Sequence, residues 1–245
     1  MARWRREGAN LPATLMAMGG LLGFAATAPY YRFGFGLLAN GAFAVVFLGA
    51  LASISRSPSH RWFEVSLAAA FLGGMASVGI VWFLPGGWLE FPLISGSMGI
   101  LGMTISMIGA RLGLMGEAEL GGRGFLNSDQ VGALLLCGGG TLGLIGSPAT
   151  VFFFFALLPL ASFVVVLLLG IGLLGAGSEG RILAVVALYF GIAGSGAFVF
   201  ILPAVIGGWV ELHWFLLVTP TATVITSLGA GLRILRATVP HPAVG

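Results

Sequence analysis

Long uninterrupted runs of apolar residues divide the sequence, and short stretches between them hold most of the charged residues. The runs are near the about 20 residues that a helix needs to cross a hydrocarbon core of roughly 30 Å. A transmembrane β-barrel would instead need shorter segments with alternating apolar and polar residues. The pattern therefore predicts an all-α integral membrane protein with eight transmembrane helices. They are expected at residues 11–28, 33–54, 64–84, 93–114, 131–145, 151–174, 182–206 and 215–234.

The composition supports lipid as the solvent of this chain. Hydrophobic residues make up 58% of the 245 positions, charged residues 8%, and the mean hydropathy is +1.06. A soluble globule could not cover its surface with so few polar side chains. The net charge of +3 comes from arginines in the connections. No basic cluster is interleaved with aromatic residues, so we do not expect nucleic acid as a partner.

The arginines predict the orientation in the membrane. Eight spans place alternate connections on opposite faces, and basic residues favour the cytoplasmic face. All but one of the 11 basic residues then share one face, and only Arg32 lies on the other. We therefore expect a multi-pass protein of the cell membrane with both termini cytoplasmic.

An internal repeat relates the two halves of the sequence. The segment LPGGWLE at residues 84–90 is matched by LPAVIGGWVE at residues 202–211, and Phe43 and Phe163 follow similar glycine-containing segments. Since each half holds four helices, both copies would enter the membrane in the same direction. This predicts a parallel tandem duplication (4+4): residues 1–116 form the first repeat, 117–130 a polar cytoplasmic linker, and 131–245 the second repeat with a short C-terminal tail.

Small residues at four-residue spacing predict where the helices pack together. The chain holds 41 glycines, and small residues let helix backbones approach each other where lipid gives no hydrophobic drive for association. The residues expected to pack in this way are Gly19, Gly23, Gly73, Ser77, Gly109, Gly113, Gly139, Gly143, Gly191 and Ser195.

Aromatic and ionisable residues gather at the face opposite the cytoplasm. They form a candidate surface for a lipid headgroup, a quinone ring or a partner protein, and they comprise Arg32, Trp88, Glu90, Trp209, Glu211 and His213. Anchoring at the interface is the other explanation, because tryptophan prefers the headgroup level. Glutamate before a helix also favours the positive end of the helix dipole.

The sequence shows no catalytic constellation. Motifs of serine hydrolases, zinc proteases and phosphate-binding loops are missing. The three histidines are not spaced to face one another within the bundle, and the single cysteine, Cys137, lies in an apolar run. We therefore expect no catalytic activity and no cofactor or metal of its own, although lipid or quinone could bind.

Three functions remain open. The favoured one is a non-catalytic membrane subunit or scaffold of a larger membrane complex, with respiratory-type energy-transducing complexes among the candidates. Its partners would be membrane lipids and other membrane subunits. The alternative is a small carrier that moves an apolar or amphipathic substrate, a lipid or a quinone, between the two halves. A third reading, from architecture alone, is a quinol-interacting membrane anchor subunit of an oxidoreductase.

Overall fold

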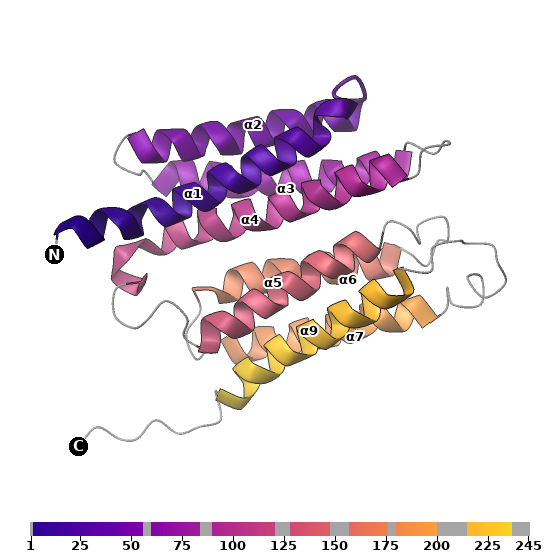
Figure 1. Ribbon diagram of the computed structural model, residues 1–245. Helices are drawn as coiled ribbons and strands as arrows, with labels where there is room; N and C mark the ends of the chain where they lie inside the picture. Colours follow the sequence, from indigo (N-terminus) through magenta and orange to yellow (C-terminus); the bar gives the residue numbers. More distant parts are fainter. Residues whose placement is uncertain are drawn as a thin grey trace, which may run out of the picture. The chain divides into compact units, whose positions relative to one another are not determined.

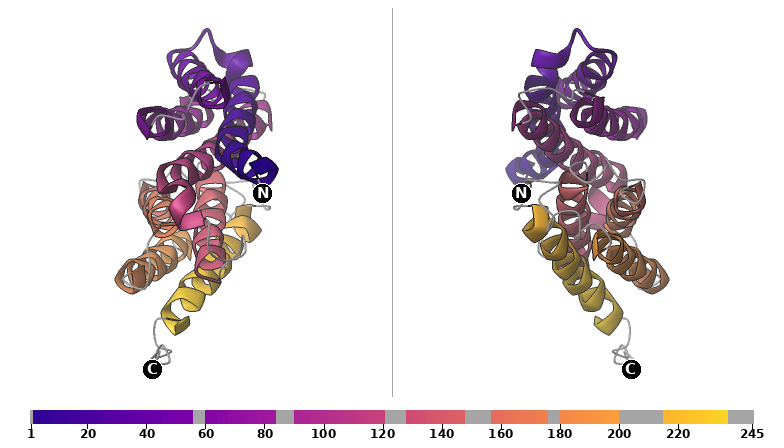
Figure 2. Two further views of the ribbon diagram at one scale, coloured as in Figure 1. Left: turned by 90° about the vertical axis from the view of Figure 1, so that its left-hand side faces the viewer. Right: turned by 90° about the vertical axis from the view of Figure 1, so that its right-hand side faces the viewer.

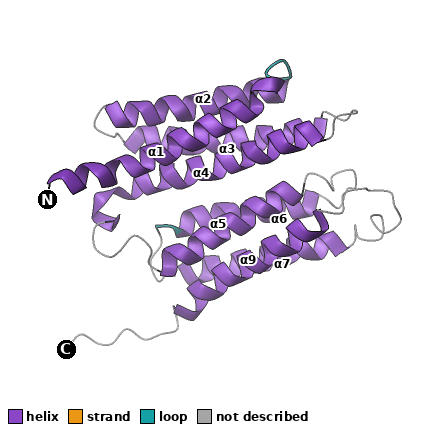
Figure 3. Ribbon diagram, viewed as in Figure 1, coloured by secondary structure: helices purple, strands orange, loops and turns teal. Residues whose placement is uncertain are grey.

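The computed structural model describes residues 2–55, 60–83, 90–120, 128–147, 157–175, 180–199 and 215–236. Side chains in several of the outer turns of these ranges are not among those described. Within these ranges the chain forms eight α-helices and one 3₁₀ turn, without a β-strand (Figure 3). The prediction of an all-helical chain is confirmed for this part of the protein.

The helices belong to two compact units, Met1–Gly122 and Arg123–Gly245 (Figure 1). The first unit contains α1 (Ala2–Thr27), the 3₁₀ turn η1 (Ala28–Tyr30), α2 (Gly34–Ser55), α3 (His60–Phe83) and α4 (Glu90–Leu120). The second unit contains α5 (Ser128–Gly146), α6 (Leu157–Leu173), α7 (Arg181–Val199) and α9 (Phe215–Arg236).

Several helices extend beyond the limits that the apolar runs predict, and α1 and α4 do so furthest. Helix α1 begins at Ala2 rather than at residue 11, and α4 continues to Leu120. Helix α5 begins at Ser128, so that both ends of the predicted linker 117–130 are helical. Glutamate, alanine and leucine, which make up residues 117–120, are strong helix formers whether or not lipid surrounds them. Hydropathy marks the part of a helix that lies in lipid, not the end of its hydrogen bonding.

Within the described ranges, five helices are long and apolar enough to cross a membrane. All four α-helices of the first unit are among them, and the second unit contributes α9. The described parts of α5, α6 and α7 form shorter apolar helices, Gln130–Gly146, Leu157–Leu173 and Arg181–Gly194. Large apolar side chains also face outward, as Leu37 at 63% exposure and Ile182 at 74% show. The described chain thus has the character of a polytopic membrane protein.

Within each unit the four helices form a closed ring. Helix α1 packs against α2 and α4, and α3 packs against the same two helices. In the second unit α5 packs against α6 and α9, and α7 completes the ring against the same two. Figure 2 shows the helices of each unit running alongside one another. The two units therefore share one order of neighbouring helices.

A phenylalanine side chain lies at the centre of each four-helix unit. Phe43 of α2 is fully buried, and a β-carbon added to Gly23 of α1 or Gly73 of α3 would come within 2.5 Å or 3.1 Å of its ring. Phe163 of α6 is also fully buried and lies against Gly143 of α5 and Gly194 of α7. In each unit, an aromatic side chain from the second helix occupies the space that two glycines leave free.

Removing either central phenylalanine side chain is expected to destabilise its unit. Phe43→Ala or Phe163→Ala leaves a cavity that surrounding helices fill only in part, at a cost of about 3–5 kcal/mol. Phe24→Ala serves as the matched control, since Phe24 is 42% exposed. Thermal unfolding in detergent, followed by circular dichroism, measures the effect. Equal midpoints for all three variants would contradict this account of the core.

Candidate functional site

Arg32 is the member of the predicted outer surface whose side chain the structure describes. It lies between the candidate spans Leu11–Tyr30 and Gly34–Ile54 and is exposed. Its Nε donates a hydrogen bond to the hydroxyl of Tyr31 at 3.0 Å, and the guanidinium carbon is 5.6 Å from the centre of the Tyr31 ring. The ring thus lies within cation–π distance of the guanidinium group, in the turn between the two candidate spans.

The other members of this surface cannot be placed with Arg32. Trp88, Trp209, Glu211 and His213 lie outside the described residues. Glu90 is the first residue of α4, but its side chain is not among those described. A shared binding surface at these positions stays a prediction.

A tight turn presents Arg32 at the end of α1. Within it, the backbone N–H of Tyr31 donates to the carbonyl of Ala28 at 3.3 Å, and that of Phe33 donates to Tyr30 at 2.9 Å. The Tyr30 carbonyl lies so close to Gly36 that a β-carbon there would collide with it. Only glycine fits at this position. The spacing of small residues did not identify Gly36, because its contact is with a turn rather than with a neighbouring helix.

Glycines bring α1 against α4 and α5 against α9 at backbone distance. A β-carbon on Gly19 would come within 2.6 Å of the carbonyl oxygen of Gly102, and one on Gly109 within 2.7 Å of that of Pro12. A β-carbon on Gly139 would come within 2.9 Å of the carbonyl oxygen of Ala222. A backbone oxygen cannot turn aside as a flexible side chain can, so any larger residue would push the two helices apart.

Two further glycines that were predicted to pack face side chains of neighbouring helices. Gly113 lies against the ring of Phe63, with Cζ 2.6 Å from an added β-carbon. Gly191 lies against Thr226, whose Cγ2 is 2.8 Å from an added β-carbon. Ser77 is fully buried. The side chain of Ser195 is outside the described set.

The same contacts recur in the two units at residue numbers that differ by 120. Gly19 faces Gly102 and Ser106, whereas Gly139 faces Ala222 and Thr226. Further equivalent contacts are Gly20 with Phe47 and Gly140 with Leu167, Gly23 with Phe43 and Gly143 with Phe163, and Gly109 with Pro12 and Gly229 with Gly132. The hydroxyls of Thr27 and Ser147 are also equivalent, since they donate hydrogen bonds to the carbonyls of Gly23 and Gly143.

Helix α7 keeps this correspondence with a different register. The sequence repeat, aligned on its Leu-Pro pairs, sets Gly191 opposite Gly73. In the structure, the glycine of α7 that faces the central ring is Gly194, with an added β-carbon 2.9 Å from Phe163, while Gly191 faces α9. The two alignments differ by three residues in α7. Contact with the Phe163 side chain decides which glycine of α7 faces the core, whereas the Leu-Pro pair marks only the end of the apolar run.

The hydroxyls of Ser95 and Thr223 donate across helices, to the carbonyls of Ala26 and Gly191. Four other polar side chains inside the apolar helices donate to the carbonyl four positions earlier in their own helix. The four are Asn40 to Gly36 at 3.1 Å, Ser77 to Gly73 at 2.8 Å, Thr104 to Ile100 at 3.2 Å, and Thr141 to Cys137 at 2.7 Å.

Arg233 of α9 is a buried cation. Its side chain is 5% exposed, and Nη1 donates to the carbonyl of Leu173, the last residue of α6, at 2.9 Å. Gly132 leaves room for its stem, since an added β-carbon would be 2.8 Å from its Cγ. A cation at the C-terminus of a helix satisfies a free carbonyl and complements the dipole. Arg233 therefore ties α9 to the end of α6.

Among the described residues, no group of three or more His, Cys, Asp and Glu side chains is placed to hold a metal ion. Comparisons with models of known protein families, with curated proteins and with solved structures find no match to this chain.

Adjacent glycines of α5 give a sharp test of backbone contact. Gly139→Ala is expected to lower stability by about 1–3 kcal/mol, because the new methyl group would overlap α9. Gly138→Ala is the matched control, since a β-carbon there meets nothing within 4 Å. Thermal midpoints in detergent compare the two variants. If both kept the midpoint of the unmodified protein, the contact between α5 and α9 would not need glycine.

Loss of the Arg233 side chain is expected to loosen α6 from α9. Arg233→Met keeps most of the stem but leaves the Leu173 carbonyl without this donor, at a cost of about 1–3 kcal/mol. Arg61→Met, at an exposed position, is the control. Hydrogen exchange of the last turn of α6, read by mass spectrometry, should rise in Arg233→Met alone. Unchanged exchange would contradict the assigned role.

Proposed function

We propose that this chain is a non-catalytic membrane subunit or scaffold of a larger membrane complex. The observation that supports this most directly is the intrahelical bonding of four polar side chains inside the apolar helices, Asn40, Ser77, Thr104 and Thr141. Each of the four donates a hydrogen bond to its own helix and needs no substrate for that bond. The partners would be membrane lipids and other membrane subunits, and a respiratory-type energy-transducing complex is one candidate assembly.

The carrier alternative makes a different demand on the same residues. A path for an amphipathic substrate needs polar groups from several helices that converge on it. Asn40 and Ser77 instead donate back to Gly36 and Gly73 of their own helices. Close contacts of glycine with Phe43 and Phe163 fill the centres of both units. These contacts favour a packed structural unit over a transport path within either unit.

We also infer that the chain is a parallel duplication of one four-helix unit. The shared order of neighbours and the glycine contacts repeated at a spacing of 120 residues support this inference. An even number of helices in each copy gives both copies the same direction through the membrane. The arginine distribution supports placing both termini on the cytoplasmic side of the cell membrane.

Extraction from the native membrane tests the proposed role. In mild detergent, the tagged chain is expected to elute with other membrane subunits in fixed stoichiometry, at a mass above the 25.2 kDa of one chain. Size-exclusion chromatography with light scattering and peptide mass spectrometry gives mass and composition. Ser77→Ala should leave the assembly unchanged, because it removes a hydroxyl that donates to its own helix.

The contrary results are equally specific. A monodisperse single chain, obtained both in detergent and in polymer-bounded native membrane discs, would exclude a stable complex. Saturable movement of a lipid or quinone by the purified chain in vesicles, lowered by Ser77→Ala, would favour the carrier.

A further inference from the structure

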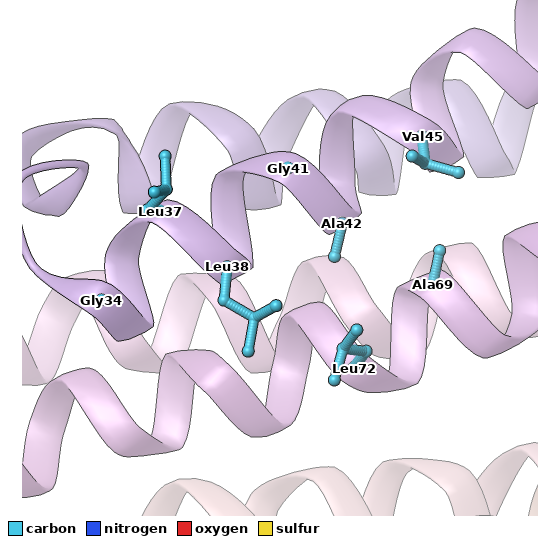
Figure 4. Close-up of a pocket in the computed structure, with 8 residues that line it drawn as sticks. All are labelled: Gly34, Leu37, Leu38, Gly41, Ala42, Val45, Ala69 and Leu72. Carbon is cyan, nitrogen blue, oxygen red and sulfur yellow. The ribbon is translucent and has the colours of Figure 1, made fainter.

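An open apolar groove runs between α2 and α3 in the first unit (Figure 4). Its volume is about 650 Å³, and every lining residue is apolar. Leu38 and Ala42 point from α2 toward α3, and Leu72 points from α3 toward α2 (Figure 4). The groove offers dispersion contacts to an occupant and no hydrogen bond from its lining side chains.

Two lining positions of this groove are exposed glycines, and no part of the described chain fills the space beside them. A β-carbon added to Gly34 or Gly41 meets nothing within 4 Å. Elsewhere in the unit the situation is reversed, since the space beside Gly23 and Gly73 is filled by Phe43. The room left by Gly34 and Gly41 is therefore available to a molecule from outside the bundle.

The length of the groove matches one leaflet of a bilayer. Its α2 side runs from Gly34 to Val45, about 16 Å at a rise of 1.5 Å per residue. Half of a hydrocarbon core of roughly 30 Å is about 15 Å. The groove begins where a candidate span begins, because Gly34 is the first residue of the span Gly34–Ile54. One extended acyl chain in one leaflet has this length and position.

A cation lies in the turn that leads into the groove. Arg32 is exposed and precedes the first lining residue, Gly34, by two positions. Its side chain contacts Tyr31, through the hydrogen bond from Nε and the position beside the ring. A guanidinium group presents several donors in one plane and binds phosphate in a bidentate manner.

We propose that this groove and Arg32 together form a binding site for a phospholipid with an anionic headgroup. One acyl chain lies along α2 and α3, and the headgroup phosphate pairs with Arg32. A partner helix or a second copy of this chain could cover the apolar groove, but neither accounts for a cation at its mouth. The site stands on its own residues and does not depend on the proposed subunit role.

The second unit lacks the residues that define this site. At positions 120 residues further on, Arg32, Gly34 and Gly41 are replaced by Phe152, Phe154 and Ala161. The sequence thus removes the cation and both glycines together. We therefore expect this kind of lipid site in the first unit only.

Native mass spectrometry of the full-length chain tests the site. The protein is released from nanodiscs that hold equal amounts of palmitoyl-oleoyl phosphatidylglycerol and the corresponding phosphatidylcholine. One retained lipid is expected, with phosphatidylglycerol favoured at least fivefold. Gly41→Leu should reduce retention at least fivefold by filling the groove. Arg32→Gln should retain lipid but lose most of the headgroup preference.

A matched control separates this site from general lipid contact. Gly172→Leu places the same side chain on α6, where a β-carbon also meets nothing within 4 Å, and should retain lipid as the unmodified protein does. Thermal midpoints verify that each variant is folded. Equal retention in Gly41→Leu, or an unchanged preference in Arg32→Gln, would overturn the proposal. A changed oligomeric mass in Gly41→Leu without lipid loss would overturn it too, and would assign the groove to another protein chain.

Discussion

Close approach of helix backbones is the constraint on which both units depend. Lipid is as apolar as the side chains of this protein, so burial alone gives helices little reason to associate. Attraction must come from contact at short range, and Gly19 and Gly139 permit it by placing one helix directly on the backbone of another. The ring order of each unit follows, because α1 and α4, or α5 and α9, are fixed as neighbours at this contact.

Two aromatic side chains fill the space that glycines leave between the helices of each unit. Phe43 and Phe163 extend from the second helix of each unit into space that glycines of the first and third helices leave free. Each ring therefore contacts two helices besides its own, and dispersion contacts of this kind add up even where each is small. Polar side chains at the same depth cause little disturbance, since Ser77 and Thr141 donate to carbonyls of their own helices. Polar bonding also joins helices, since the hydroxyl of Ser95 in α4 donates to the carbonyl of Ala26 in α1.

Sequence patterns predicted the helices well and their lateral partners only in part. Apolar runs gave all eight α-helices to within a few residues at most ends, because lipid requires long apolar segments. They missed the extensions of α1 and α4, which lie where hydropathy no longer reports on helix formation. The four-residue spacing of small residues also missed Gly36 and Gly194. Gly36 contacts the carbonyl of a turn, and Gly194 depends on the register of α7, and this spacing indicates neither. The grouping of Trp88, Glu90, Trp209 and Glu211 remains a prediction, because those side chains lie outside the described residues.

The positions of Phe43 and Phe163 along the chain affect the order in which the two units can assemble during synthesis. Every contact of Phe43 with Gly23 and Gly73 joins residues that precede α4, and the contacts of Phe163 all lie after residue 122. Synthesis proceeds from the N-terminus, so the core of the first unit can close while the second is still on the ribosome. Each unit thus has the means to assemble as a separate step of membrane insertion. A mutation in the core of one unit would then lower the fraction of chains in which that unit assembles, before it affects the protein as a whole.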